Sequence, residues 1–272
     1  MFCGGMGMRM RDGVTDAPKP MAMVGERPLL WHVMRYYAHY GHKEFILCLG
    51  YGASAVKEFF LEYDEARSND FVLENGGKDI TLFSTDIADW RISFVDTGLT
   101  SSIGERLRRV RRFVEDDEMF LANYADVLTD APLDDMVATF RESDAAACLL
   151  AAPLQSTHHV VDLDDAGRIT RLMPVRELRQ WENGGYFILR PSIFDVLHAD
   201  EELVDDAIGR LVSDGRAIAY PYKGFWTAAD TVKDRLILEE MYQRGRCPWM
   251  LWDADRGPHP DGEPGPTVPS LP

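Results

Sequence analysis

Cysteine is scarce in this chain of 272 residues, and long apolar runs are missing. The four cysteines are Cys3, Cys48, Cys148 and Cys247. They are far apart and form no C-x-x-C pair, so we expect free thiols in a reducing cytoplasm rather than a disulfide framework. No stretch of about 18 apolar residues occurs, so no membrane-spanning helix is expected. Residues 1–5 have neither the basic start nor the apolar stretch of a signal peptide.

Positive charge is also in short supply. Lysine and arginine number 29 against 45 aspartates and glutamates, which gives a formal net charge of −16. An acidic chain repels the phosphate backbone of nucleic acids over long distances. We therefore expect no nucleic-acid partner and no membrane partner, whereas a small anion can still bind in a local basic pocket.

What the chain does contain is a regular alternation of apolar runs and amphipathic segments. Strands are expected at 45–50, 92–96, 119–124 and 145–152, and helices at 29–40, 53–63, 103–114 and 132–142. This alternation predicts an α/β fold with a mostly parallel sheet and helices on both faces, for about residues 1–155.

The following segment has a different pattern. A β-hairpin is expected at 160–172, strands at 186–189 and 218–222, and helices at 191–197, 204–212 and 231–244. The last twenty residues hold six prolines and three glycines, a composition typical of disorder. We expect a single domain over 1–252, with a first part at about 1–155 and a second part at 156–252, and a disordered tail at 253–272.

Glycines cluster near the start of the chain. The segment contains Gly4, Gly5, Met6, Gly7, Met8 and Arg9. Glycines let backbone N–H groups approach an anion closely, and Arg9 and the later Lys19 add positive charge suited to phosphates. The spacing matches neither the P-loop nor the dinucleotide fingerprint. A flexible N-terminus is the alternative interpretation.

Two aspartates stand where ligands bind in α/β proteins. Asp126 follows an expected strand, and ligands bind beyond the carboxyl ends of such strands. A carboxylate there can hold Mg²⁺ together with phosphate oxygens. Asp230 precedes an expected helix. The alternatives are a solvated loop or Asx turn for Asp126 and an N-cap for Asp230.

The order of these and other short motifs resembles the sugar-nucleotide pyrophosphorylases, and within them the glucose-1-phosphate cytidylyltransferase branch. Besides the glycine segment, the similar residues are 19–21, 29–32, 48–51, 95–98, 104–110, 183–187, 224–226, 230–231 and 245–249. Each motif is modest, but the ordered set covers about residues 2–250.

The resemblance implies a Rossmann-like nucleotide-binding sheet with a sugar-binding elaboration, and Mg²⁺-dependent transfer of a nucleotidyl group to a sugar 1-phosphate. It places the glycine segment with Arg9 on the triphosphate and Lys19 on the reacting phosphates. By motif position, the remaining residues are Ser101, Arg106 and Ala125 for the nucleotide, Asn183 and Gly184 for the sugar, and Asp126 and Asp230 for Mg²⁺. The family commonly self-associates, so a homo-oligomer is expected.

The chain departs from the family pattern at several places. Only Met1–Cys3 precede the glycines, where the family has a full apolar strand, and Met8 and Ala125 replace threonine and glycine. The family's Glu-Lys-Pro motif should fall near 172–176, where Arg171 or Arg176 are the substitute cations. CTP and glucose 1-phosphate are the expected substrates. Another sugar phosphate or base, or a non-catalytic binding role, are the alternatives.

Overall fold

The computed structural model describes residues 1–5, 18–154 and 158–253. Its α-helices are α1 (Leu29–His39), α2 (Ala53–Leu61), α3 (Ile103–Arg109), α4 (Leu133–Arg141), α5 (Gly209–Ser213) and α6 (Val232–Gln243). The strands are β1 (Met23–Val24), β2 (Arg27–Pro28), β3 (Glu44–Leu49), β4 (Phe71–Glu74), β5 (Asp79–Leu82), β6 (Arg91–Asp96), β7 (Phe120–Asn123), β8 (Val127–Thr129), β9 (Ala147–Pro153), β10 (His159–Leu163), β11 (Ile169–Pro174), β12 (Trp181–Leu189), β13 (Ala217–Pro221) and β14 (Trp226–Ala228).

The first residues of the chain connect two sets of strands in the central sheet. β3 pairs parallel with β6, and β13, β9, β12 and β7 follow one another in a second set of strands. Phe2 N donates to Asn123 O of β7 at 2.9 Å, while Cys3 N donates to Cys48 O of β3 at 3.0 Å. Residues 1–3 therefore bridge the two sets. β12 alone runs antiparallel to its neighbours β7 and β9, which makes the sheet mixed.

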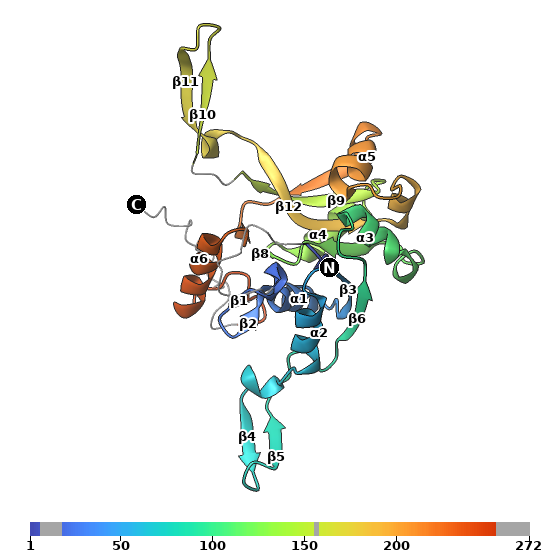
Figure 1. Cartoon of the computed structure of the whole chain (residues 1–272), viewed down its shortest axis with the longest axis vertical. Coiled ribbons are helices and arrows are strands. Elements are labelled where there is room, and N and C mark those ends of the chain that lie inside the picture. Colours follow the sequence, from blue (N-terminus) through green and yellow to red (C-terminus); the bar gives the residue numbers. More distant parts are fainter. Residues whose placement is uncertain (6–17, 155–157, 254–272) are drawn as a thin grey trace.

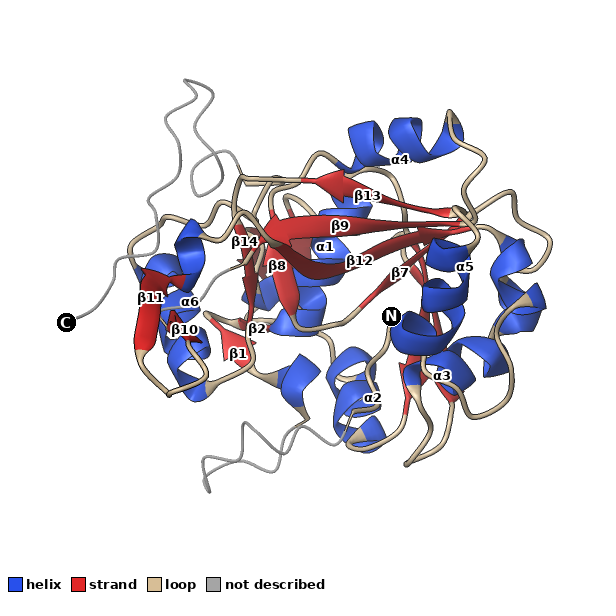
Figure 2. Ribbon diagram, turned by 90° about the horizontal axis from the view of Figure 1, so that it is seen from above, coloured by secondary structure: helices blue, strands red, loops and turns tan. Residues whose placement is uncertain are grey.

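Side chains of the sheet alternate between two apolar cores. Leu47 and Ile188 lie in the core under α1 and α4, whereas Cys48 and Phe187 lie in the core under α3 and α5. This alternation follows from the strand period of two residues. Figure 2 shows α4 on one face of the sheet and α3 and α5 on the other. The predicted α/β class, with helices on both faces of a Rossmann-like sheet, is confirmed.

Most predicted elements are present, but two predicted helices take other forms. Pro191–Asp195 is a 3₁₀ helix, closed by Ile193 N donating to Arg190 O at 2.9 Å. Its few residues complete only i→i+3 bonds. The helix expected at 204–212 begins with a π-helical turn, Leu203–Ile208, before α5. A prediction of a plain α-helix was wrong at both places.

Two antiparallel ribbons project in opposite directions from the body of the protein (Figure 1). One is the predicted hairpin, formed by β10 and β11. The other, formed by β4 and β5, was not predicted from the sequence. None of the described helices is long and apolar enough to cross a membrane. Of the predicted tail, residues 254–272 lie outside the described part of the chain.

Candidate active site

A cavity of about 380 Å³ gathers residues from distant parts of the chain. Its lining consists of Phe2, Gly5, Lys19, Pro20, Ile103, Tyr124, Asp126, Val127, Glu182, Asn183, Trp226, Ala228 and Asp230. Five of the predicted site residues are among them, namely Gly5, Lys19, Asp126, Asn183 and Asp230. The fold thus brings both predicted metal aspartates, the predicted catalytic lysine and a predicted sugar-binding residue to one hollow.

The pairing of β8 with β14 explains why two aspartates about a hundred residues apart meet. The strands are antiparallel, with Val127 opposite Ala228. The next step along the ladder is a hydrogen bond from Ala229 N to Asp126 O at 2.9 Å. Asp126 and Asp230 therefore emerge at the same end of the pair. Asp126 is only 20% exposed, which argues against a solvated loop, and the N-cap of α6 is Thr231 rather than Asp230.

Lys19 lies between the two carboxylates. It starts a 3₁₀ turn, Lys19–Met21, which is fixed by the flanking prolines and by Met21 N donating to Pro18 O at 2.7 Å. Its Nζ is 2.6 Å from Asp126 Oδ2 and also forms an ion pair with Asp230.

Burial opposes the charge on both buried members of this group. At Lys19 the two carboxylates outweigh burial and raise the pKa of the ammonium group. At Asp126 burial, with Asp230 nearby, outweighs Lys19 and raises the pKa of the carboxyl. Lys19 is therefore held as a cation, and the carboxylate of Asp126 gains from any additional positive charge that comes into contact with it.

Another part of the cavity wall is built on an irregularity in β12. The register of β12 against β9 shifts between Asn183 and Phe187. Asn183 Oδ1 accepts a hydrogen bond from Gly185 N at 3.0 Å, and Gly185 has φ +74°, which favours glycine. Gly184 O accepts from Trp226 Nε1 at 2.8 Å. These bonds fix the direction in which the Asn183 side chain points.

The guanidinium of Arg106 is buried and hydrogen-bonded within the protein, whereas a residue that contacts a ligand was expected. It is 2% exposed, and its guanidinium donates to the carbonyls of Gly4, Leu49 and Gly98 at 2.9–3.1 Å. A Cβ on Gly4 would come 2.2 Å from Arg106 Nη1, so only glycine allows this approach. Arg106 thereby ties the start of the glycine segment to the ends of β3 and β6.

The remaining predicted residues are distributed as follows. Ser101 donates its hydroxyl to Thr97 O near Arg106, and Ala125 is buried in the core beside Asp126. Neither lines the cavity. Arg171 lies on the β10–β11 ribbon, 3.8 Å from Asp162. Met6, Gly7, Met8 and Arg9 lie outside the described residues.

Sequence reasoning missed several residues of the cavity wall. Glu182, Tyr124 and Ile103 all line it. Glu182 directly precedes Asn183, and its place next to a predicted sugar-binding residue was the available signal. Tyr124 and Ile103 carried no such signal, because their position depends on how β7 and α3 pack.

The aspartate pair fits a magnesium ion only in part. No group of three or more His, Cys, Asp or Glu residues that could hold a metal occurs within 1–5, 18–154 and 158–253. Asp126 and Asp230 nevertheless both contact one cationic atom, Lys19 Nζ. Mg²⁺ is typically bound by one or two carboxylates together with phosphate oxygens and water. The chemistry of the donor set therefore fits Mg²⁺ carried by a phosphate compound.

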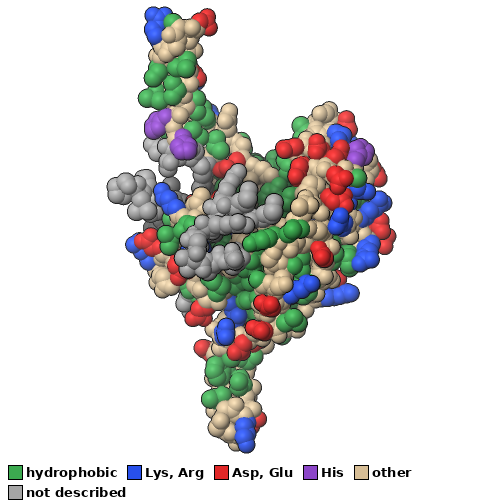
Figure 3. All heavy atoms as spheres, in the orientation of Figure 1, with side chains coloured by type: hydrophobic (Ala, Val, Ile, Leu, Met, Phe, Trp, Pro, Cys, Tyr) green, Lys and Arg blue, Asp and Glu red, His purple; other side chains and the backbone are tan. Residues whose placement is uncertain are grey.

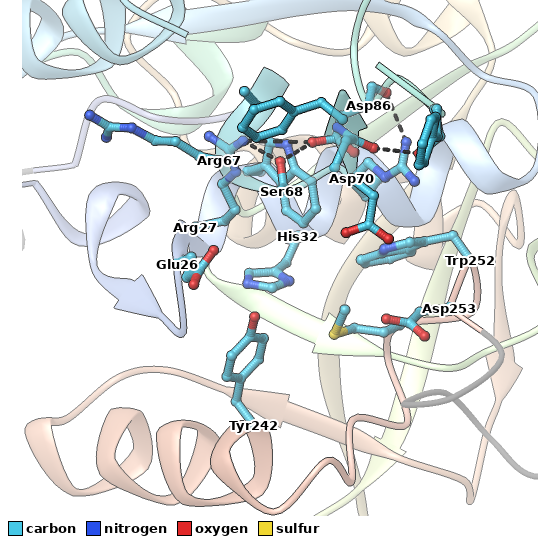
Figure 4. Close-up of a pocket in the computed structure, with 18 residues that line it drawn as sticks. Glu26, Arg27, His32, Arg67, Ser68, Asp70, Asp86, Tyr242, Trp252 and Asp253 are labelled. Carbon is cyan, nitrogen blue, oxygen red and sulfur yellow. Dashed lines mark hydrogen bonds and ion pairs between the residues drawn. The ribbon is translucent and has the colours of Figure 1, made fainter. Parts of the chain in front are cut away.

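A larger cavity, of about 890 Å³, lies elsewhere on the molecule and contains none of the predicted site residues (Figure 4). Rings of Trp31, Trp252 and Tyr242 line it. Asp86 accepts a hydrogen bond from Ser68 there and lies 3.7 Å from Arg27. Arg27 and Asp86 thus form an ion pair within the wall of this cavity.

Comparisons with known proteins identify the family of this chain. No family model matches the chain. A probable glucose-1-phosphate cytidylyltransferase of Bacillus subtilis is 33% identical, with 93% of this chain and 98% of that protein covered. The chain belongs to the sugar-nucleotide pyrophosphorylases, in the glucose-1-phosphate cytidylyltransferase branch. The glucose-1-phosphate cytidylyltransferase of Salmonella typhimurium is 30% identical over the same shares of the two chains.

Solved structures place this nucleotidyltransferase in the same fold. A UDP-glucose pyrophosphorylase complexed with UDP-glucose matches with a TM-score of 0.65 and 18% identity, over 90% of this chain and 97% of that one. HddC from Yersinia pseudotuberculosis matches with a TM-score of 0.63 and 16% identity, over 89% and 97%. The protein is a sugar-1-phosphate nucleotidyltransferase, and the nucleotide-diphospho-sugar transferase fold predicted for it is confirmed.

Proposed function

We propose that this nucleotidyltransferase makes CDP-glucose from CTP and glucose 1-phosphate, releasing pyrophosphate. The observation that carries the proposal is the convergence of Lys19, Asp126 and Asp230 in the wall of a cavity that Asn183 also lines. Support for these substrates comes from relatives named glucose-1-phosphate cytidylyltransferase that match over almost their whole length.

The reaction needs positioning and charge neutralisation rather than a covalent intermediate. An oxygen of the sugar 1-phosphate bonds to the α-phosphorus of CTP, the bond from that phosphorus to the bridging oxygen breaks, and pyrophosphate leaves. Asp126 and Asp230 would hold Mg²⁺, which when bound neutralises charge on the phosphate oxygens. Lys19 would contact the reacting phosphates, and holding both reactants in line supplies most of the remaining rate increase.

The other assignments complete the proposed site. Gly4 to Arg9 would surround the triphosphate, with Arg106 holding Gly4 in place. Ser101 and Ala125 would lie beside the nucleotide, and Asn183 with Gly184 would hold the sugar. We place this site in one domain over 1–252 of a cytoplasmic enzyme, a location supported by four free, buried cysteines.

Self-association is part of the proposal. Both ribbons expose apolar side chains, and two-stranded ribbons are marginally stable unless they pack against something. Figure 3 shows apolar groups along the ribbon at the top of the view. The exposed apolar residues of the two ribbons are Phe71, Val72, Leu73, Ile80, Val161, Leu163, Ile169 and Leu172. A second copy of this chain is the partner that we propose for them.

A second candidate substrate pair rests on one observation. No lysine occurs near 172–176, and Arg171 is 3.8 Å from Asp162 on the ribbon rather than in the cavity. Arginine does not replace lysine equivalently at a phosphate site. The same transfer with another sugar 1-phosphate is therefore the alternative to glucose 1-phosphate.

Pyrophosphate release is the direct test. We expect release with Mg²⁺, CTP and glucose 1-phosphate, and little with UTP, dTTP or GTP in place of CTP. Asp126→Asn should lower kcat by about 100-fold or more, since it weakens the proposed metal site. The matched control is Asp89→Asn, which removes a surface carboxylate paired with Lys43, and it should leave the rate unchanged.

Two results would count against the proposal. A preference for another triphosphate or another sugar 1-phosphate would replace the substrate pair and favour the second candidate. Silence with the whole panel of triphosphates and sugar phosphates would leave a non-catalytic binding protein as the better account.

A further inference from the structure

The contacts of Lys19 have a consequence that the reaction itself does not require. Its ammonium group touches a carboxylate oxygen of Asp126 and one of Asp230, and so takes the position between them. A divalent cation held by the same two carboxylates has to displace this group. Without another anion, Lys19 and the cation therefore compete for the same position between the two carboxylates.

The three groups are mounted on backbone that resists rearrangement. Lys19 is in the proline-flanked turn, Asp126 directly precedes β8, and Asp230 directly precedes Thr231, the N-cap of α6. Thr231 and Asp234 form a capping box at that helix start, which fixes the chain next to Asp230. The side chain of Lys19, a flexible stem of four methylene groups, can leave the carboxylates without moving an element.

The charge balance decides when that movement is favourable. Lys19 and Asp126 are 17% and 20% exposed, so solvent screens their attraction only in part. Moving the ammonium away from both carboxylates without a new partner is costly. A triphosphate offers that partner, because its oxygens can contact Lys19 and at the same time complete the coordination of a metal ion.

We propose that Lys19 keeps divalent cations off Asp126 and Asp230 until a nucleoside triphosphate binds, so that metal and nucleotide binding are coupled. The inference rests on the proposed function, because it concerns the metal that the two aspartates would hold. Coupling of this kind follows from linkage, since any ligand that moves Lys19 away raises the affinity for the cation and the reverse also holds.

Binding of Mn²⁺ alone, without nucleotide and without turnover, tests the coupling. The free Mn²⁺ signal in electron paramagnetic resonance gives the affinity directly. Lys19→Met removes the ammonium and keeps much of the side-chain volume, and we expect it to bind Mn²⁺ about tenfold or more tightly than the unmodified protein. Lys43→Met removes a surface lysine that is paired with Asp89, and it should bind Mn²⁺ as the unmodified protein does.

Two further variants secure the interpretation. Asp126→Asn combined with Lys19→Met should abolish the gained affinity, which locates the ion at this pair. Lys19→Gln gives the same comparison with a polar side chain, and circular dichroism verifies that each variant is folded. The inference is overturned if Lys19→Met and Lys19→Gln bind Mn²⁺ no more tightly than the unmodified protein, or if the double variant keeps the gain.

The same samples separate this inference from the proposed function. Pyrophosphate release by the unmodified protein, with unchanged Mn²⁺ affinity in the Lys19 variants, would sink the coupling and leave the function standing. Tighter Mn²⁺ binding in the Lys19 variants, without turnover by the unmodified protein on any substrate pair, would support the role of Lys19 and contradict the proposed function.

Discussion

At the scale of single residues, the role of a side chain depends on the groups that surround it in the folded protein. Arg106 was predicted beside the nucleotide, and its guanidinium donates to four backbone carbonyls and to the Thr97 hydroxyl next to the glycine segment. Buried carbonyls need such donors, so a residue of this kind connects fold and site in one set of bonds. Asp230 is the opposite case, a side chain that the fold leaves available. Thr231 caps α6, so the neighbouring carboxylate of Asp230 can contact a cation.

His32 is a buried titratable group whose environment fixes its neutral form. It is 1% exposed, lies 3.0 Å from Val24 O through Nε2, and receives the indole N–H of Trp249 at Nδ1. Burial is the main reason why its pKa is lowered to about 4. Protonation would place a second N–H opposite that of Trp249, in addition to burying a charge.

The lowered pKa makes stability depend on pH in a definite direction. Between pH 6.5 and 4 the unfolded chain binds a proton at this histidine that the folded state does not, so the free energy of unfolding falls as the pH falls. From pH 7.5 to pH 5 we expect a loss of about 2 kcal/mol from this group.

Urea unfolding of the unmodified protein and of His32→Gln at the two pH values measures the effect. The stability advantage of the unmodified protein should shrink by that amount at pH 5. A difference between the two proteins that stays constant with pH would mean that His32 does not contribute.

At the scale of elements, short strands matter more than their length suggests. β8 and β14 have three residues each, yet their pairing brings Asp126 and Asp230 together. β14 also contains Trp226, whose indole N–H donates a hydrogen bond to Gly184 O of β12. One small ladder thus relates the proposed metal side of the cavity to the proposed sugar side.

Trp226→Phe tests this connection. The change keeps an aromatic ring but removes the hydrogen bond to Gly184 O, which weakens the support of Asn183. We expect the KM for the sugar phosphate to rise about fivefold, the effect of one lost hydrogen bond, with the KM for CTP nearly unchanged.

Trp90→Phe is the matched control. The indole N–H of Trp90 is buried and has no hydrogen-bond partner within the described residues, so its removal breaks no bond. Equal rises in both KM values for Trp226→Phe, or the same rise in the control, would argue against a specific link to the sugar side.

At the scale of the whole molecule, the two ribbons are the parts least stabilised by packing within the chain. The base of the β4–β5 ribbon is nonetheless firmly attached, because Glu65 accepts hydrogen bonds from Asp86 N and Ile87 N at 2.6 and 3.0 Å. A rigidly mounted ribbon that exposes Leu73 and Ile80 is suited to packing against another chain.

We expect sedimentation to give a multiple of the 30.8 kDa chain mass. Leu73→Lys with Ile80→Lys should dissociate the assembly, because both charges would be buried in the contact. Leu61→Lys is the control, since Leu61 is 83% exposed and belongs to α2 rather than to either ribbon. A monomeric mass for the unmodified protein would end the proposal of self-association.

The alternation of strands and helices, the class of fold and the family all follow from local patterns in the sequence. The spacing of apolar residues predicts which face of an element is buried. Ordered motifs such as Lys19–Met21 and Asn183–Phe187 can be recognised because they are local patterns. The β10–β11 hairpin was predictable for the same reason, because its strands and its turn are close together in the chain.

Which residues meet depends on contacts that form only in the folded chain. The bridging of β3 and β7 by residues 1–3, the β8–β14 pairing and the placement of Lys19 between two distant aspartates are all long-range contacts. Such contacts depend on strand register and on packing across the sheet, which no local pattern encodes. The exposed β4–β5 ribbon was missed for a related reason, because its apolar residues lack a core within the same chain.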